Sequence, residues 1–460
     1  MKAAIFGAGN IGRGLVGEVL ADCGYQLAFI DADASIVELL NSAGSYEIQY
    51  SSGPRTVAIE TAINAADEDA VHRAVSQADV VATAVGPAVL KIVAPAIGQG
   101  LSGRTSQSVN VLACENVHPN SSALRDHVVT AVGAGAVDGV GFPNVVVDRI
   151  VPSEPGSAVV AVEDGFEFVV DAGSWVGPMP EGQLQFSPDL DAYKLRKLWL
   201  VNGLHVAAAY LGIRSQHEHI HEAMADTSIR DRVAAIGGVM AQALATKTDE
   251  FAASDLEDYC ATTLDRFSNA SLPDRAKRVA RNPLAKLAAE ERLLAPANTA
   301  AGLGLDTTDF ADVIAHALTT SDPDIEGMEA LQAQLSSSGL DSFLTDHCGI
   351  APNGDLYTQI ESRMTELQTR RGISLITEEI VITNPAGLHA RPAAEIVEAA
   401  KTSPADVRIH KGDKAANAKS IMSVLALGAN TGDTVKLTVE GEGADVIVAA
   451  LRSIMQSEEH

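Results

Sequence analysis

Lys2-Ala3-Ala4-Ile5-Phe6-Gly7-Ala8-Gly9-Asn10-Ile11-Gly12 is the stretch that decides the fold of the first part of this chain. Residues 3–6 are apolar and predict a short buried strand, and apolar residues then recur at helical spacing from Ile11 to Leu20. A second strand is expected over residues 26–30, after a helix stop at Gly24. A strand, a helix and a strand in this order predict a parallel sheet.

The glycines between the first strand and the first helix fit the pattern G-x-G-x-x-G. Gly7 permits a tight turn, Gly9 lets a pyrophosphate approach the backbone, and Gly12 allows close packing of the helix. The N-terminus of the helix adds unpaired N–H groups and a positive potential. A glycine-rich turn without a ligand is the alternative interpretation of these residues taken alone.

Asp31 favours the nucleotide interpretation because it stands at the end of the second expected strand. A carboxylate at this position binds the ribose hydroxyls and would repel a 2′-phosphate, so NAD is predicted in preference to NADP. The expected cofactor-binding residues are Gly7, Ala8, Gly9, Asn10, Ile11, Gly12 and Asp31.

Outward from this site, the hydrophobic pattern predicts three domains. Further buried strands are expected over residues 79–85 and 108–114, and helical patterns take over from about residue 188. Those helices are expected over residues 195–211, 229–244, 284–294 and 326–335. We therefore expect a Rossmann-type α/β domain over residues 1–190, a mostly helical domain over 191–370, and a small α+β domain over 375–460.

Charge and composition exclude several classes of protein. The formal net charge of −27, with no basic stripe to offset it, argues against nucleic acid as a partner. No run is apolar enough to cross a bilayer and no signal peptide is evident, so we expect a cytoplasmic protein with no membrane insertion. The cysteines are far apart and form no CxxC pair, which suggests neither disulfides nor a zinc ribbon.

One predicted helix gathers an amine, an amide and an imidazole, on Lys197, Asn202 and His205. At about 100° per residue these three project within a sector of roughly 140°. Alcohol oxidation needs a base for the hydroxyl proton and a donor for the developing alkoxide. Lysine among apolar neighbours can be that base when it is uncharged. The alternative is a snorkelling lysine, a capping asparagine and a core histidine.

Several segments together resemble the zinc-independent long-chain polyol dehydrogenases, most closely the mannitol-1-phosphate 5-dehydrogenases, over about residues 1–370. These segments are GAGNIGRG at 7–14, TAVGP at 83–87, ACEN at 113–116, FPNVVVDRI at 142–150, and the helix with Lys197, Asn202 and His205. The resemblance implies that Lys197 is the catalytic base and that Asn202 and His205 belong to the substrate and oxyanion site. It also implies a second amide at Asn144.

The resemblance implies reversible, NAD-dependent oxidation of D-mannitol 1-phosphate to D-fructose 6-phosphate. The Lys or Arg residues that would grip the substrate phosphate are not identifiable, so a mannitol 2-dehydrogenase and a hexuronate reductase stay open as alternatives. A phosphorylation-regulated sensor of the sugar phosphate is a further alternative, which retention of Lys197 disfavours.

A metal motif is also present, because His217-Glu218-His219-Ile220-His221 satisfies H-E-x-x-H. A zinc protease would need a third ligand at a suitable spacing, and none is evident. The polyol dehydrogenases that the chain resembles use no zinc. We therefore interpret the segment as the polar start of a helix and predict no metal.

Near the C-terminus, residues 384–394 place His389 at the mouth of an expected helix, with Arg391 two residues later. A phosphoryl group on this imidazole would meet unpaired N–H groups, the positive helix end and a guanidinium group. An ordinary helix cap is the alternative interpretation of a histidine at this position.

The segment Gly387-Leu388-His389-Ala390-Arg391-Pro392-Ala393 resembles the active centre of HPr, the phosphocarrier of the sugar phosphotransferase system. The resemblance covers about residues 375–460 and implies an open-faced α+β sandwich. It makes His389 the phosphoacceptor through Nδ1 and Arg391 the phosphate partner, with enzyme I as donor and IIA domains as acceptors. Ser420 matches the regulatory serine that a kinase modifies in some bacterial lineages.

Overall fold

The computed structural model of the protein describes residues 1–104, 108–151, 157–270, 274–370, 373–412 and 414–457. These form two compact units, Met1–Val279 and Ala280–His460. The boundary between the units falls inside the segment expected to form the helical domain. The division at 1–190, 191–370 and 375–460 therefore stays a prediction.

The first unit contains the expected parallel sheet. Its strand order is β5-β2-β1-β6-β7-β8, and every pair in it is parallel. The strands are β1 (Lys2–Phe6), β2 (Gln26–Asp31), β5 (Thr61–Asn64), β6 (Val80–Thr83), β7 (Val109–Ala113) and β8 (Val140–Gly141). Ala3 and Ile5 of β1 enter one hydrophobic core, whereas Ala4 and Phe6 enter another. The sheet is therefore covered on both faces, as in other parallel sheets.

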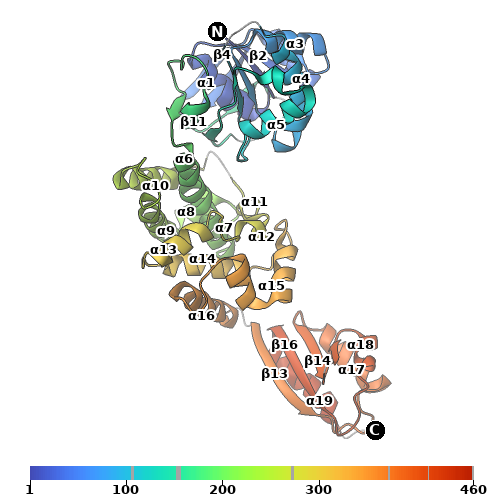
Figure 1. Ribbon diagram of the computed structural model, residues 1–460. Coiled ribbons are helices and arrows are strands. Elements are labelled where there is room, and N and C mark those ends of the chain that lie inside the picture. The colour runs from blue at the N-terminus through green and yellow to red at the C-terminus, as the bar shows by residue number, and fades with distance from the viewer. Residues whose placement is uncertain (105–107, 152–156, 271–273, 371–372, 413, 458–460) are drawn as a thin grey trace. The chain divides into compact units, whose positions relative to one another are not determined.

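Helices cover this sheet (Figure 1). They are the π-helical segment η1 (Gly12–Gly17) with α1 (Glu18–Asp22), then α2 (Ala34–Ala43), α3 (Glu68–Gln77), α4 (Leu90–Ser102) and α5 (Ser121–Val132). Short 3-10 turns lie at Pro87–Val89 and Ala134–Val137. Gly24 has a φ of +81°, which confirms the expected stop after the first helix.

Two small sheets were not predicted from the sequence. One has the order β10-β3-β4, and the other has the order β12-β11-β9. Their strands are β3 (Ser45–Tyr50), β4 (Gly53–Ala58), β10 (Val159–Ala161), β9 (Val145–Asp148), β11 (Glu167–Asp171) and β12 (Gln185–Ser187), with a 3-10 turn at Ala172–Ser174. Strand β9 lies inside the FPNVVVDRI segment of residues 142–150.

A continuous helical run follows β12, as expected. It consists of α6 (Leu190–Arg196), the π-helical segment η5 (Lys197–Gly203) and α7 (Leu204–Arg214). Further helices are α8 (Ile220–Ala225), α9 (Thr227–Ala245), α10 (Ala253–Phe267) and α11 (Ala276–Ala280). The helices expected over 195–211 and 229–244 are therefore confirmed.

The helical part of the second unit differs from expectation in one place. Its elements are α12 (Pro283–Lys286), α13 (Leu294–Gly302), α14 (Thr308–Thr319), α15 (Met328–Ser342), η6 (Phe343–His347) and α16 (Asp355–Arg370). The single helix predicted over 284–294 is wrong, because α12 ends at Lys286 and α13 begins only at Leu294. Leu287 and Leu293 are both buried although neither lies inside a helix. Buried leucines in the turns between the two helices therefore have a spacing like that of a helical face.

The C-terminal part of the second unit is a small α+β fold with its own core. Its antiparallel sheet has the order β13-β16-β14-β15. The strands are β13 (Ile373–Val381), β14 (Asp406–Lys411), β15 (Lys414–Asn417) and β16 (Thr434–Glu442), and the helices are α17 (Ala390–Lys401), α18 (Ile421–Ala426) and α19 (Ala444–Gln456). Alternate strand residues such as Ile380, Leu437 and Val439 fill the core with Ile396 of α17. The predicted fold class is confirmed.

Throughout the part of the chain that the structure describes, no helix combines the length and the apolar character needed to cross a bilayer.

Candidate active sites

The glycine loop has the geometry of a dinucleotide cradle. Gly7 has a φ of +98°, and a Cβ on it would lie 2.5 Å from the Ala84 carbonyl oxygen. A Cβ on Gly12 would lie 1.9 Å from the Gly7 oxygen, so both positions require glycine. Gly9 is exposed, and a Cβ on it would meet nothing within 4 Å. The backbone at Gly9 is therefore open to a ligand.

Asp31 reaches this loop from the end of β2. Its Oδ2 accepts a hydrogen bond from the Ala8 N–H at 2.6 Å, and its Oδ1 accepts one from the Asp33 N–H at 2.9 Å. Asn10 and Ile11 form the first turn of the following helix and are partly exposed. An open glycine backbone beside a carboxylate fits the pyrophosphate and the ribose of NAD.

Arg13 supports the loop from the protein side, a role that the sequence analysis missed. Its side chain is buried, and Nε donates to the Ala8 carbonyl at 2.7 Å. One terminal nitrogen donates to the Ser157 carbonyl at 2.7 Å. Burial lowers the pKa of Arg13 below its usual value. Only the partners across the fold reveal this role, because a lone arginine after a glycine loop carries no signal of it.

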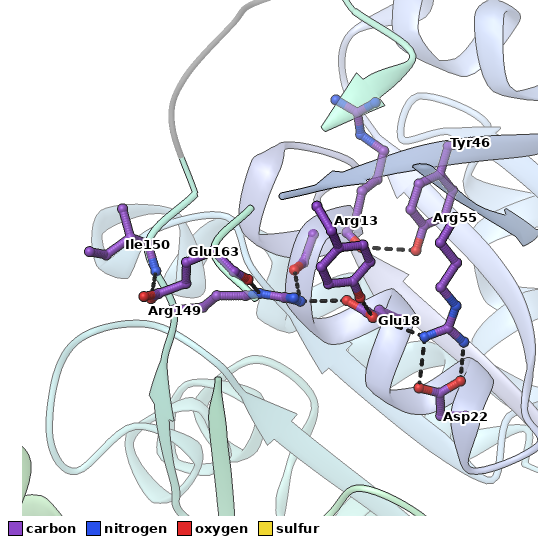
Figure 2. Close-up of polar contacts among 10 residues, drawn as sticks. Arg13, Glu18, Asp22, Tyr46, Arg55, Arg149, Ile150 and Glu163 are labelled. Atoms are coloured by element: carbon purple, nitrogen blue, oxygen red, sulfur yellow. Dashed lines mark hydrogen bonds and ion pairs between the residues drawn. The ribbon is translucent and has the colours of Figure 1, made fainter. Parts of the chain in front are cut away.

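A buried ion cluster lies one turn further along the same helix. Figure 2 shows the Glu18 carboxylate between the guanidinium groups of Arg149 and Arg55, and the Arg55 contact measures 2.9 Å. Glu18 is 1% exposed. Arg149 also donates to the carbonyls of Gly14, at 2.6 Å, and Glu163, at 3.1 Å. The cluster thus fixes the glycine-loop helix to the segment that follows β9.

Lys197, Asn202 and His205 lie on the run from η5 into α7, and all three are partly exposed among buried neighbours. In a π-helix the hydrogen bonds join residues five apart, so Lys197 and Asn202 are neighbours across one turn. His205 follows Asn202 by three positions and belongs to the same face. The π-helical turn brings Asn202 nearer to the direction of Lys197 than an α-helix would. The shared face of all three residues stays a prediction.

The Lys197 amine faces β9. Nζ donates to the Val147 carbonyl at 2.6 Å and to Asn116 Oδ1 at 3.4 Å, and it lies 3.8 Å from Asp148 Oδ1. Asn116 belongs to the ACEN segment that follows β7. The lysine of the helical region thus meets the ends of two strands of the nucleotide-binding part.

Asp148 is itself paired with Arg266 of α10, at 2.8 Å. Two other nitrogens of Arg266 donate to Glu163, each at 2.7 Å. Burial works against the charge of this guanidinium, but the carboxylates of Asp148 and Glu163 raise the pKa of Arg266 well above its usual value. Arg266 therefore offsets the carboxylate that stands beside Lys197. Sequence reasoning missed both Asp148 and Arg266.

His205 lies against α10 rather than against the Lys197 amine. Its ring stacks on Phe267 with centroids 4.6 Å apart, and Nε2 is 3.4 Å from Asp274 Oδ2. Burial lowers the pKa of His205 to about 4, although Asp274 favours the charged form. The imidazole is neutral near pH 7.

Asn144 stands just before β9, and its side chain also caps α5. Its Oδ1 accepts hydrogen bonds from Asn120 N at 3.1 Å, Ser122 N at 3.2 Å and Ser122 Oγ at 3.1 Å. With the oxygen used in this way, the amide nitrogen is the group that can donate to a substrate oxygen. The complete substrate site, with Lys197, Asn144 and Asn202 around one substrate, stays a prediction.

The H-E-x-x-H segment does not form the helical pair that a zinc protease needs. His217 lies between α7 and α8, His219 caps α8, and of the three only His221 is inside the helix. The Glu222 carboxylate accepts the backbone N–H groups of Glu218 and His219, each at 3.0 Å. The segment is a capped helix start, as the sequence analysis expected. The residues that the structure describes include no cluster of three or more His, Cys, Asp or Glu suited to a metal.

The second site is at the start of α17, where His389 occupies the N-cap position and is exposed. His389 Nε2 lies 3.1 Å from Asn430 Oδ1. Pro392 has no N–H group, so Ala390 and Arg391 supply the N–H donors at this helix end. Arg391 forms an ion pair with Glu395 at 3.2 Å, so its guanidinium is engaged one turn along the helix.

Ser420 occupies the N-cap position of α18, with an extended backbone. It is partly exposed, and its carbonyl accepts the Val424 N–H at 3.0 Å. The next residues, Ile421 and Met422, are exposed apolar side chains. A serine at a helix N-terminus is a favourable place for a phosphate.

Comparison with known families covers nearly the whole chain. Residues 1–182 match the mannitol dehydrogenase Rossmann domain, and residues 189–352 match the mannitol dehydrogenase C-terminal domain. Residues 376–457 match the PTS HPr component phosphorylation site.

Individual relatives agree with these matches. A mannitol-1-phosphate 5-dehydrogenase of Bacillus licheniformis is 35% identical over 378 residues, which cover 79% of this chain and 100% of that protein. One of Arthrobacter sp. is 38% identical over 383 residues, covering 80% of this chain and 99% of that protein.

Among solved structures, a mannitol 2-dehydrogenase of Pseudomonas fluorescens in a ternary complex with NAD and D-mannitol shares the fold. It has a TM-score of 0.60 and 19% identity, and the match covers 80% of this chain and 92% of that one. The chain therefore belongs to the mannitol dehydrogenase family and carries, after its dehydrogenase part, a segment of the HPr phosphocarrier family.

Proposed function

We propose that this chain is a bifunctional protein that oxidises D-mannitol 1-phosphate to D-fructose 6-phosphate with NAD, reversibly, and carries a phosphoryl group on His389. The observation that carries the first activity is its coverage of 99–100% of relatives named mannitol-1-phosphate 5-dehydrogenase, at 35–38% identity. The second activity rests on the HPr match over residues 376–457.

In the dehydrogenase site, Lys197 is the proposed base that takes the proton of the substrate hydroxyl. NAD, when bound, would supply the hydride acceptor for this oxidation, and the loop of Gly7, Gly9 and Gly12 with Asp31 would hold it. Lys197 is suited to this role because Asn116 and Val147 hold its amine at the ends of two strands. A base must lie within hydrogen-bond reach of the proton that it removes.

Asn144 and Asn202 are the proposed donors to the oxygen on which negative charge develops. Three donors hold the Asn144 oxygen, so its amide nitrogen is oriented before substrate binds. Donors fixed in advance stabilise an alkoxide because they need no reorganisation during the reaction. His205 is neutral near pH 7 and contributes a polar ring to the substrate site without adding a positive charge.

In the carrier segment, His389 accepts a phosphoryl group from enzyme I and passes it to IIA domains. Ala390 and Arg391 offer backbone N–H groups to the phosphate at the positive end of α17. Arg391 would exchange its exposed pairing with Glu395 for the phosphate, an exchange that costs little because exposed ion pairs are weak. Phosphorylation of Ser420 by a kinase is part of the same proposal.

We further propose that the protein works in the cytoplasm, where NAD and the phosphate donors of the phosphotransferase system are found. The two activities would then serve one route, in which imported mannitol arrives as its phosphate and is oxidised by the same chain.

A substrate panel tests the dehydrogenase proposal. The full chain is mixed with NAD or NADP and with mannitol, mannitol 1-phosphate or glucitol 6-phosphate. In the reverse direction it is mixed with NADH or NADPH and with fructose 6-phosphate. We expect a change in NADH absorbance only with mannitol 1-phosphate and fructose 6-phosphate. Turnover of unphosphorylated mannitol alone would instead make the protein a mannitol 2-dehydrogenase. Tight binding of mannitol 1-phosphate without turnover would make it a sensor.

A labelling experiment tests the carrier proposal. Enzyme I and labelled phosphoenolpyruvate are incubated with the full chain and with its His389→Ala and His410→Ala variants. His410 is the matched control, because it is a histidine of the same small fold that belongs to β14 and not to the start of α17. We expect label on the wild type and on His410→Ala only. Label on His389→Ala would show that another residue is the acceptor.

A further inference from the structure

The turn that carries His389 is packed against a second loop, residues 428–433. Leu388 N–H donates to the Ala429 carbonyl at 2.8 Å, and Thr431 Oγ1 donates to the Asn384 carbonyl at 2.7 Å. Gly387 has a φ of +58°, and a Cβ on it would lie 2.7 Å from the Ala429 oxygen. The 428–433 loop is therefore a platform for the histidine turn.

Charged and backbone contacts close the 428–433 loop. Lys411 Nζ donates to the Gly428 carbonyl at 2.8 Å and to Asp433 Oδ2 at 2.6 Å. Asp433 Oδ2 also accepts the Asn430 N–H at 2.7 Å. The hydrogen bond from the Asn430 N–H, and after it the bond from Lys411, lower the pKa of Asp433. The Asp433 carboxylate is therefore charged at neutral pH, and its hydrogen bonds keep the loop closed. Asn430 is thus held in place from both ends of the loop.

The side-chain amide of Asn430 has one chemically consistent orientation. Its Nδ2 lies 3.4 Å from the Gly428 carbonyl, which can only accept a hydrogen bond. Its Oδ1 therefore faces His389 Nε2, at 3.1 Å. An amide oxygen also can only accept, so the proton of the neutral imidazole belongs on Nε2. The lone pair is then on Nδ1.

From this geometry we propose that Asn430 is a positioning residue, which holds His389 as the Nε2–H tautomer and directs phosphoryl transfer to Nδ1. This proposal rests on the proposed carrier function. In the transfer, the Nδ1 lone pair forms a bond to phosphorus while the bond between phosphorus and the donor nitrogen of enzyme I breaks. The Nε2 proton stays in place and continues to donate to Asn430. No proton therefore has to leave the ring during the transfer.

The test compares three forms of the full chain: wild type, Asn430→Leu and Asn430→Asp. Leucine removes the acceptor at similar size, whereas aspartate keeps an oxygen that accepts from Nε2. The tautomer of His389 is measured at pH 8.5 from imidazole ¹⁵N shifts in histidine-labelled protein, with the signal assigned by its loss in His389→Ala. Each form is also phosphorylated with phosphoramidate, and the ratio of Nδ1- to Nε2-phosphohistidine is measured.

We expect wild type and Asn430→Asp to be predominantly Nε2–H and to carry phosphate on Nδ1. In Asn430→Leu the ratio of Nε2–H to Nδ1–H tautomer should fall roughly fivefold, the effect of losing one ordinary hydrogen bond. The proportion of Nε2-phosphohistidine should rise with it. A purely structural role for Asn430 would slow labelling without changing the isomer ratio, and that result would overturn the proposal.

Two further results distinguish the role of Asn430 from a folding defect and from failure of the carrier function. If Asn430→Leu disturbs the spectrum of the whole segment, Asn430→Ala replaces it, and an unchanged tautomer in that variant also overturns the proposal. If wild type accepts no phosphate at His389, the carrier function fails, and direction of transfer by Asn430 fails with it. The tautomer measurement then still reports whether Asn430 controls the imidazole.

Discussion

His205 is neutral near pH 7 because burial lowers its pKa to about 4, in spite of the Asp274 carboxylate 3.4 Å away. An unfolded histidine titrates near 6.5, so at pH 5 the unfolded chain binds a proton that the folded site does not accept. Stability therefore falls as the pH decreases from about 6.5 towards 4. Between pH 8 and pH 5 this linkage removes about 2 kcal/mol of unfolding free energy.

The measurement is urea unfolding of the wild type and of His205→Asn at both pH values. Tryptophan fluorescence follows the first unit alone, because both tryptophans, Trp175 and Trp199, lie within Met1–Val279. The variant should lose about 2 kcal/mol less than the wild type between pH 8 and pH 5. An exposed histidine of α5 gives the control, since His127→Asn should lose as much as the wild type. Equal losses in all three proteins would contradict a neutral imidazole at His205 in the folded chain.

Asp31 holds the glycine loop and is the proposed partner of the cofactor ribose, and two substitutions can separate these roles. Its carboxylate holds the Ala8 N–H, and its charge would oppose the 2′-phosphate of NADP. Asp31→Asn keeps an oxygen acceptor and removes the charge, so the loop should stay in place while discrimination against NADP falls about tenfold, or ~1.4 kcal/mol. Asp31→Ala should also weaken NAD binding. The kcat/KM ratio for the two cofactors checks this, and an unchanged ratio in both variants would exclude the ribose role.

At the scale of elements, the Glu18 and Arg149 pair fixes the glycine-loop helix to the segment after β9 (Figure 2). Arg149→Met leaves the buried Glu18 carboxylate with Arg55 as its only cationic partner among the described residues, beside the Tyr50 hydroxyl, and removes the bonds to Gly14 and Glu163. Breaking a buried pair from one side costs about 3–5 kcal/mol. We expect that loss in the urea unfolding of the first unit, together with weaker NAD binding.

Arg55→Met is the matched control, because the Arg55 side chain is 39% exposed whereas that of Arg149 is fully buried. A partly exposed pair contributes about 1 kcal/mol or less, so this variant should be nearly as stable as the wild type. The double variant Glu18→Gln with Arg149→Met should recover part of the loss, since it leaves no unpaired charge. Similar losses in Arg149→Met and Arg55→Met would mean that burial does not decide the strength of this cluster.

Helices and strands could be predicted from the sequence where the apolar residues keep one spacing, helical or alternating, along the whole element. Strand β1, the glycine loop and the helix that begins there were predicted because the period changes sharply at Gly7. The small sheets around β3 and β9 were missed because their strands are short and half-exposed. The predicted helix over 284–294 was wrong because buried leucines in a turn imitate helical spacing.

Prediction of the candidate site was limited in the same way, to residues that are close together in the sequence. Lys197, Asn202 and His205 share one helix, so their shared face could be predicted from spacing. The π-helical turn that begins at Lys197 could not, because it depends on packing rather than on a residue pattern. Asp148 and Arg266 are distant in sequence, and only the folded chain brings them to within 2.8 Å of each other.

At the scale of the whole molecule, Lys197 and His389 belong to different compact units, and a separate activity is proposed for each. Lys197→Ala should lower kcat for mannitol 1-phosphate oxidation by about 10²–10⁴-fold, the usual contribution of a general base. Because the carrier segment has a separate core, phosphate acceptance should not change. Lys194→Ala, which removes a more exposed amine one turn earlier, should leave kcat within about twofold of the wild type, a difference of under ~0.5 kcal/mol in barrier.

The reciprocal variant, in the carrier segment, tests whether the dehydrogenase depends on His389. His389→Ala should end phosphate acceptance and leave kcat and KM of the dehydrogenase unchanged, if the fusion only keeps two steps of one route together. The kcat and KM of the wild-type dehydrogenase, measured before and after phosphorylation by enzyme I, show whether phosphorylation of one unit changes the activity of the other. Equal constants mean two independent activities on one chain. A shift in KM on phosphorylation that His389→Ala abolishes would mean that the phosphoryl group regulates the dehydrogenase, and independence of the two units would then be wrong.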